Sequence, residues 1–379
     1  MTDTRNYAQS HPVVRMSSKR FAASPFLERY VTDDAVLGAY SGRLYPLSLG
    51  SDPVEDYWHL RRHAALFDVP EHPIQVEGPD AERFLDHVLT RDVGALPVGR
   101  ARYAIACNER GGILMDGVLI RRSGNVFWYV LADGEIMRWF EAHARGFDVT
   151  ISDPSSWVLQ VQGPTSLGVL DAACDGGAPV PFPYFGVSEV EMGGQPVLIS
   201  RTGWSGELGF EIYTAEGVDA AALWDHLLDA GADHDLAVLS LEALGIRRIE
   251  AGILDNGSDM NPSLTPFDVG LGRVVDMGKP AFIGRDALAT AERRSRLYGV
   301  SGPSTPVPGT SVLHGDTVVG SITAGAWSPH FEHGIGYVVM REVGEWEGQE
   351  VLLAGEVQPF EVVKLPYYDA ERKLPRGLA

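Results

Sequence analysis

The clearest pattern of hydrophobic and polar positions in this chain runs from Tyr103 to Leu119. An apolar run at 103–107, a polar turn at 108–112 and a second apolar run at 113–120 predict a β-hairpin. Asp116 interrupts the second run. Its carboxylate either caps a tight Asp-Gly bend or is held in an apolar pocket, where a charge is costly and usually has a task.

The rest of the chain alternates helical and strand patterns. Residues 52–67 predict a helix entered through Pro53. A strand, a Gly-Pro turn and a helix follow one another at 74–85, and the same order returns at 159–170, which predicts two related α+β halves. Helical spacing recurs at 218–229 and at 236–251. Short β-like runs beyond residue 297 predict a third, small all-β domain.

Composition restricts the function classes. The 379 residues include 31 Lys plus Arg and 51 Asp plus Glu, a net charge of −20, which argues against nucleic acid as a partner. No run of eighteen apolar residues predicts a membrane span, and residues 1–23 lack the apolar core of a secretion signal. We therefore expect a cytoplasmic protein with an N-terminal arm at 1–23. Two cysteines and eleven histidines show no metal-ligand spacing, so no metal site is predicted.

Three segments stand out chemically. Residues 201–213 form a Gly-rich bend carrying Trp204, followed by a strand carrying Glu211; they predict either a hairpin with a packed tryptophan or a cover over a flat ligand. In 244–252, Arg248 lies in an Arg-Arg-Ile-Glu run that is either a structural ion pair or a fork for a carboxylate or a pterin carbonyl. In 324–330, Trp327 is either a core residue or an aromatic wall for a cation.

Together these segments resemble the aminomethyltransferase family, whose best-known member is the T-protein of the glycine cleavage system. The resemblance runs from about Ser24 to Tyr368. Its pieces are 67–69 (Phe-Asp-Val), 76–79 (Val-Glu-Gly-Pro), 107–108 with 111–116 (Cys-Asn, Gly-Gly-Ile-Leu-Met-Asp), 162–164 (Gln-Gly-Pro), 201–211, 248–251, 261–262 with 265–271, and 282–288. Each piece is weak, but the ordered set is highly specific.

The resemblance implies a three-domain cloverleaf of α+β class, with two α+β domains and a C-terminal β-barrel-like domain around a tetrahydrofolate site. The domains expected are 24–70 with 153–290, 71–152, and 291–379. By position, Asp116 matches the catalytic aspartate. Glu211 and Arg248 match residues that grip the pterin. The residues that match its lining are Tyr103, Trp204 and Val118.

Two departures from the T-protein pattern favour the dimethylsulfoniopropionate demethylase branch of the family. Met115 stands where the T-protein has a second aspartate, and Trp204 stands where it usually has tyrosine. The main hypothesis is therefore transfer of a methyl group from a small onium or methoxy donor to N5 of tetrahydrofolate. Trp204 and Trp327 would recognise the onium centre. For a methoxy donor, Tyr40, Tyr45 or His72 would protonate the leaving oxygen.

Two alternatives stay open. One is aminomethyl transfer of glycine-cleavage type, giving methylenetetrahydrofolate, and the other is a non-catalytic folate-binding protein. A lipoyl carrier is acidic, so a net charge of −20 makes it an unlikely partner and favours methyl transfer over aminomethyl transfer. A small-molecule methyl donor is the partner expected instead, and the sequence predicts no oligomeric state.

Overall fold

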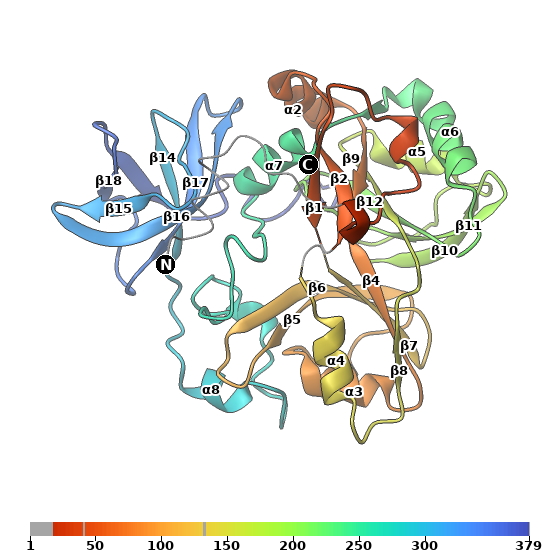
Figure 1. Cartoon of the computed structure of the whole chain (residues 1–379), viewed down its shortest axis with the longest axis horizontal. Coiled ribbons are helices and arrows are strands. Elements are labelled where there is room, and N and C mark those ends of the chain that lie inside the picture. The colour runs from red at the N-terminus through yellow and green to blue at the C-terminus, as the bar shows by residue number, and fades with distance from the viewer. Residues whose placement is uncertain (1–17, 41, 132–133, 379) are drawn as a thin grey trace.

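The computed structural model describes residues 18–40, 42–131 and 134–378, and these form three lobes (Figure 1). Residues 1–17, most of the predicted arm, lie outside the described residues. The lobes are built on a six-stranded sheet, a five-stranded sheet and a closed six-stranded barrel. This mixed architecture, with two sheets that carry helices and an all-β C-terminal barrel, confirms the predicted fold class.

The six-stranded sheet collects strands from both sides of the five-stranded one. Its order is β10 (Val187–Met192), β11 (Gln195–Ser200), β12 (Gly209–Thr214), β9 (Val158–Gln162), β3 (Ala65–Val69) and β13 (Ala237–Val238). Only the short β13 pairs in parallel, with β3. Apolar side chains on one face pack under α5 (Ser166–Ala173) and α6 (Ala220–Gly231).

The five-stranded sheet has the order β5 (Arg100–Cys107), β6 (Ile113–Arg121), β7 (Val126–Leu131), β4 (His72–Glu77) and β8 (Thr150–Ser152). One face packs against α3 (Ala81–Val88) and α4 (Met137–His143). Strands β5 and β6 pair antiparallel across the turn at 108–112, so the predicted hairpin is confirmed.

The barrel closes in the order β14 (Leu297–Gly302), β17 (His333–Met340), β16 (Thr317–Ser328), β15 (Ser311–His314), β18 (Glu350–Leu353) and β19 (Phe360–Val363). The remaining elements lie outside these three sheets. They are the hairpin β1 (Val36–Tyr40) with β2 (Arg43–Ser48), the helices α2 (Pro53–Arg62), α7 (Leu241–Glu250) and α8 (Arg285–Thr290), and short 3₁₀ turns at 18–20, 27–29, 232–234 and 272–274.

Local sequence explains several of these elements. Asp52 caps α2 by accepting a hydrogen bond from the Val54 amide at 2.8 Å, and Pro53 opens the helix. The two Gly-Pro turns of the predicted repeat are equivalent: Gly78 has φ +134° and Gly163 has φ +114°. A Cβ atom on Gly163 would lie 1.9 Å from the His63 carbonyl oxygen, so the turn requires glycine.

Two predicted boundaries are wrong. The helix expected at 52–67 ends at Arg62, because residues 65–69 pair with β9 and β13 as strand β3. The helix expected at 236–251 begins only at Leu241, because Ala237 and Val238 extend the six-stranded sheet as β13. The Ala237 amide donates to the Ala64 carbonyl at 3.1 Å, a sheet contact that the apolar run could not reveal.

The two sheets meet through their helix-free faces. The inter-sheet cluster consists of Leu60, Ala65, Phe67, Val69, Ala101, Ile120, Trp128, Val130, Val158, Leu198, Tyr213, Leu239 and Leu244. Side chains on these facing surfaces therefore point toward the junction of the lobes. Among the described residues, no helix has the length and apolar character needed to cross a membrane.

Candidate functional site

Asp116 lies on β6 and faces the junction. Alternation along the strand places Asp116, Val118 and Ile120 on one face, whereas Met115 packs into the helix-covered core on the other. Tyr103, opposite Val118 on β5, donates a hydrogen bond from its hydroxyl to Oδ2 of Asp116 at 2.7 Å. The carboxylate of Asp116 is therefore fixed by a side-chain hydrogen bond and does not cap a bend. The side chain of Met115 points to the opposite face of the strand.

The surroundings of Asp116 disfavour its charge. Burial raises its pKa from 3.8 to about 6, although hydrogen bonds from Tyr103 and Asn256 oppose this rise. Nδ2 of Asn256 is buried and makes no hydrogen bond of normal geometry in the described part of the chain. We interpret the Asn256 contact as long or poorly aligned, as polar contacts in a site without ligand often are.

The loop after α7 brings a second carboxylate to the site. The charge of Asp255 also raises the pKa of Asp116, so the two groups lie close together. Asp255 accepts hydrogen bonds from Ser258 Oγ at 2.6 Å and from the Tyr40 hydroxyl at 3.3 Å. The β1–β2 hairpin thus reaches the site through Tyr40, one of the three acids considered for a methoxy donor.

Arg248 connects this loop to the Gly-rich bend. Its guanidinium pairs with buried Asp259, and it lies 5.3 Å from the centre of the Trp204 ring and 5.6 Å from that of Tyr337 in the barrel. The cation therefore covers part of the Trp204 ring that was predicted to receive an onium group. Asp116 interacts with Asp255, and Asp255 interacts with Arg248. Arg248 lies beside Trp204, which packs on the inter-sheet cluster together with Val118 of β6.

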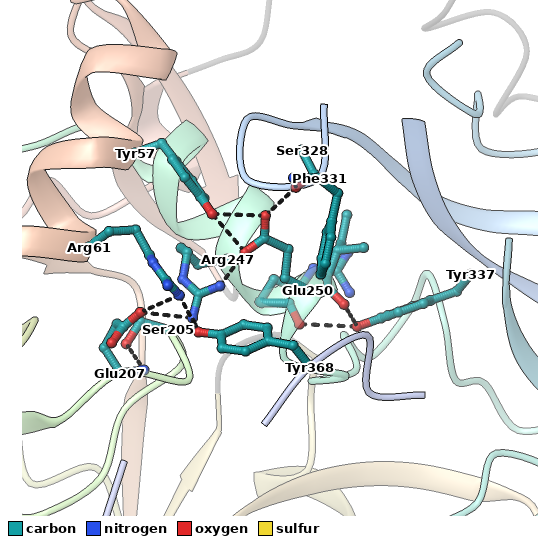
Figure 2. A network of polar contacts seen from close by, with 12 residues as sticks. Tyr57, Arg61, Ser205, Glu207, Arg247, Glu250, Ser328, Phe331, Tyr337 and Tyr368 are labelled. Atoms are coloured by element: carbon teal, nitrogen blue, oxygen red, sulfur yellow. Dashed lines mark hydrogen bonds and ion pairs between the residues drawn. The ribbon is translucent and has the colours of Figure 1, made fainter. Parts of the chain in front are cut away.

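Arg247 points into a different network, at the junction of α2, α7 and the barrel (Figure 2). It is fully buried and pairs with Glu250 and with Glu207, the latter at 2.8 Å between Nη2 and Oε1. Ser328 of β16 donates to Glu250 at 2.5 Å, and Tyr57 of α2 donates to it at 3.0 Å. The structural ion pair considered for this run thus belongs to Arg247, and it fixes the helix that presents Arg248.

Glu211 lies on β12 and faces the inter-sheet cluster. Its Oε2 accepts hydrogen bonds from Thr202 at 2.8 Å, from Ser200 at 3.4 Å and from Tyr213. Its Oε1 accepts a 3.3 Å contact from Gln160 Nε2. Oε1 is therefore the oxygen with capacity left for a ligand.

Trp327 is not joined to this group. It lies near the end of β16 with 44% of its surface exposed, and none of the contacts among described residues links it to Asp116, Trp204 or Arg248. Its substrate-binding role stays a prediction. His72 lies at the start of β4, and its Nε2 is 2.9 Å from Asp153.

The sequence analysis missed two arginines near the site. Burial lowers the pKa of Arg273, and the positive charge of Arg372 lowers it further. The Arg273 side chain makes no hydrogen bond or ion pair within the described residues, and Tyr103 is among the groups that interact with its charge. Arg273 is exposed and Arg372 is half-buried, and neither guanidinium has an acidic partner among the described residues. No local motif marks them, because they lie about 100 residues apart in the chain.

A separate cleft of about 490 Å³ lies between the two sheets. Its lining includes Gln75, Trp128, Glu189 and Tyr213 but neither Asp116 nor Arg248. We place the candidate site at Asp116, because polar groups from four segments converge there.

Comparison with known proteins gives consistent results along most of the chain. Residues 28–279 match the GCVT N-terminal domain, and residues 296–369 match the glycine cleavage T-protein C-terminal barrel domain. The chain belongs to the glycine cleavage T-protein family. Members of this family are tetrahydrofolate-dependent one-carbon transferases, so the chain is an enzyme of that type.

Individual T-protein relatives align with this chain over nearly its full length. The aminomethyltransferase of Streptomyces coelicolor is 34% identical over 361 residues, 89% of this chain and 95% of the relative. That of Thermotoga maritima is 32% identical over 358 residues, 91% and 97% respectively. The crystal structure of glycine cleavage system aminomethyltransferase T from Bartonella henselae is 29% identical, covers 92% of this chain and 98% of that chain, and gives a TM-score of 0.84.

These comparisons change the order of our hypotheses. The T-protein family and tetrahydrofolate are confirmed. None of the relatives named here points to the dimethylsulfoniopropionate branch, and their names support the aminomethyl alternative better than the main hypothesis. The expectation against a lipoyl carrier rests on the net charge of −20, and the names of these relatives count against it.

Proposed function

We propose that this enzyme is an aminomethyltransferase of glycine-cleavage type. It would move the carbon of an S-aminomethyl group on a lipoyl carrier to tetrahydrofolate, with release of ammonia and the free thiol and formation of methylenetetrahydrofolate. The observation that carries the proposal is the carboxyl group of Asp116, buried and held by Tyr103, in a chain that aligns with aminomethyltransferases over nine-tenths of its length.

The residues present fit a reduced folate. The spare Oε1 of Glu211 suits the N–H edge of a pterin, which offers neighbouring donors. Val118, Trp204 and Tyr103 supply apolar surface for a flat ring. Arg273 and Arg372 suit the carboxylates of a folate glutamate.

Asp116 would act by its charge. An ionised carboxylate in a site of low polarity stabilises positive charge that develops on a nearby nitrogen, and it does so most strongly when it is fixed in advance. The hydrogen bond from Tyr103 provides that fixation and favours the ionised form. We therefore expect Asp116→Asn to lose most turnover while it still binds folate.

Methyl transfer remains a second candidate because of the surface charge. A net charge of −20 is unfavourable for docking an acidic carrier protein, whereas a small onium donor needs no such docking. Asp116 and Asp255, with Tyr40 beside them, would also suit a cationic donor.

Product analysis separates the two candidates. The protein is incubated with tetrahydrofolate and either an aminomethyl-lipoyl carrier or a panel of sulfonium and quaternary ammonium compounds, and the folate products are identified by mass. Methylenetetrahydrofolate formed only with the carrier supports our proposal, and 5-methyltetrahydrofolate formed with an onium compound contradicts it. The Asp116→Asn variant serves as the control for uncatalysed transfer, and an unchanged folate dissociation constant in Glu211→Ala would refute the pterin assignment.

A further inference from the structure

A row of polar side chains crosses the six-stranded sheet on its inter-sheet face. Ser200, Glu211 and Gln160 are register partners on the neighbouring strands β11, β12 and β9. Glu71, two residues beyond the end of β3, reaches the same row. Fully buried Gln160 donates from Nε2 to Glu71 Oε1 at 2.8 Å and to Glu211 Oε1 at 3.3 Å.

Two buried oxygens in this row lack a partner among the described residues: Oε2 of Glu71 and Oε1 of Gln160. Both are acceptors if Glu71 is ionised, and leaving a buried acceptor unpaired destabilises the fold. Turning the Gln160 amide over does not help, since its oxygen would then lie against both carboxylates.

A single proton on Glu71 would give both unpaired oxygens a hydrogen-bond partner. If Glu71 is a neutral acid, its O–H can donate to the Gln160 carbonyl while its other oxygen accepts from the amide N–H. An acid and a primary amide then form a ring of two hydrogen bonds. The second N–H of Gln160 remains directed at Glu211.

The charges around the pair favour this state. Burial raises the pKa of Glu71 to about 8, and the negative charges of Glu211 on β12 and Asp68 on β3 add to the rise, while Arg43 on β2 opposes it. The charge of Glu71 also acts on Tyr213 of β12. Burial raises the pKa of Glu211 as well, but the hydroxyl groups that donate to its Oε2 oppose this rise and favour its ionised form. We therefore assign the proton that the two carboxyls share to Glu71.

We propose that Glu71 is protonated in the folded protein and is a positioning residue, which through its acid–amide ring with Gln160 holds Glu211 as the single anion of the row. The role of this arrangement in ligand binding rests on the proposed function: the ring keeps the anionic Oε1 of Glu211 in place for the donor edge of a pterin. Ionisation of Glu71 would place two anions on one amide and disturb that oxygen.

Infrared difference spectroscopy tests the protonation without any ligand. The folded protein at pH 7 should show a carbonyl band of a buried carboxylic acid that is absent from Glu71→Gln and retained in the control Glu77→Gln, which changes the opposite end of β4. A spectrum in which Glu71→Gln keeps the band, or in which the band is missing from the unmodified protein, would overturn the proposal.

The pH dependence of tetrahydrofolate binding tests the positioning role. Between pH 7 and pH 9 the protonated fraction of Glu71 falls about tenfold, so the dissociation constant should rise by up to about tenfold. Glu71→Gln should bind without that pH dependence, because an amide keeps one donor and one acceptor at every pH, and it should bind more tightly than Glu71→Leu. A dissociation constant of the unmodified protein that stays level from pH 7 to pH 9 would overturn the role. Unchanged binding in Glu211→Ala would instead overturn the folate site, while the infrared result would still stand.

Discussion

Replacing Asp116 by asparagine should make the protein more stable while it loses activity. The pKa of this carboxyl is raised from 3.8 to about 6, mainly by burial. At 1.36 kcal/mol for each tenfold change in proton affinity, the ionised group costs the folded state roughly 3 kcal/mol above pH 7. Asparagine has nearly the same shape, carries no charge and still accepts the hydrogen bond from Tyr103, so it avoids most of this cost.

The sign of the pH dependence follows from the direction of the shift. The folded state binds the Asp116 proton more tightly than the unfolded state, so protonation stabilises the fold below pH 4, and this contribution is lost as pH rises through about 6. The stability advantage of Asp116→Asn should therefore be greatest at pH 8 and nearly absent at pH 4. Thermal midpoints at both pH values measure it, and 3 kcal/mol corresponds to several degrees in a protein of this size.

A matched control is Asp316→Asn, which changes an exposed aspartate in the β15–β16 turn and should leave the midpoint unchanged at both pH values. Turnover is measured on the same samples. If Asp116→Asn is no more stable than the unmodified protein at pH 8, or if its advantage does not shrink on acidification, then Asp116 is not a destabilised carboxylate and our account of the site is incorrect.

Three further predictions concern the same site and its support. Tyr103→Phe removes a hydrogen bond that lowers the pKa of Asp116, so the acid limb of the pH–rate profile should move up by about 1, and an unmoved limb would contradict the role of Tyr103. Arg273→Ala should weaken binding of tetrahydrofolate but not of a tetrahydropterin without the glutamate; equal losses in a titration of both would exclude the proposed contact. Gly163→Ala should destabilise the fold by about 3 kcal/mol or more, since φ is positive and the new Cβ meets a carbonyl oxygen. The control Gly245→Ala, at a position in α7 with open space around it, should stabilise the fold by up to about 1 kcal/mol. Urea unfolding measures both changes.

Much of the fold follows from local sequence. The hairpin at 103–120, the helix opened by Asp52 and Pro53, and the two Gly-Pro turns depend on neighbouring residues, because turn chemistry, capping and alternation act over a few positions. The exact boundaries of the three domains stay a prediction. The start of the helix at Leu241 was missed, because pairing of Ala237 and Val238 with a distant strand overrides the local pattern.

The candidate site divides in the same way. Asp116 stood out as a charge in an apolar strand, and Glu211, Arg248 and Trp204 stood out through their motifs. Which of these residues share a face, and which oxygen of Glu211 is left for a ligand, depends on strand register between segments up to 100 residues apart. Asn256, Arg273 and Glu71 carry no local signal at all. Their surroundings arise only when the lobes close, because burial and the charges of neighbouring segments, rather than adjacent residues, decide the protonation and hydrogen bonding of a side chain.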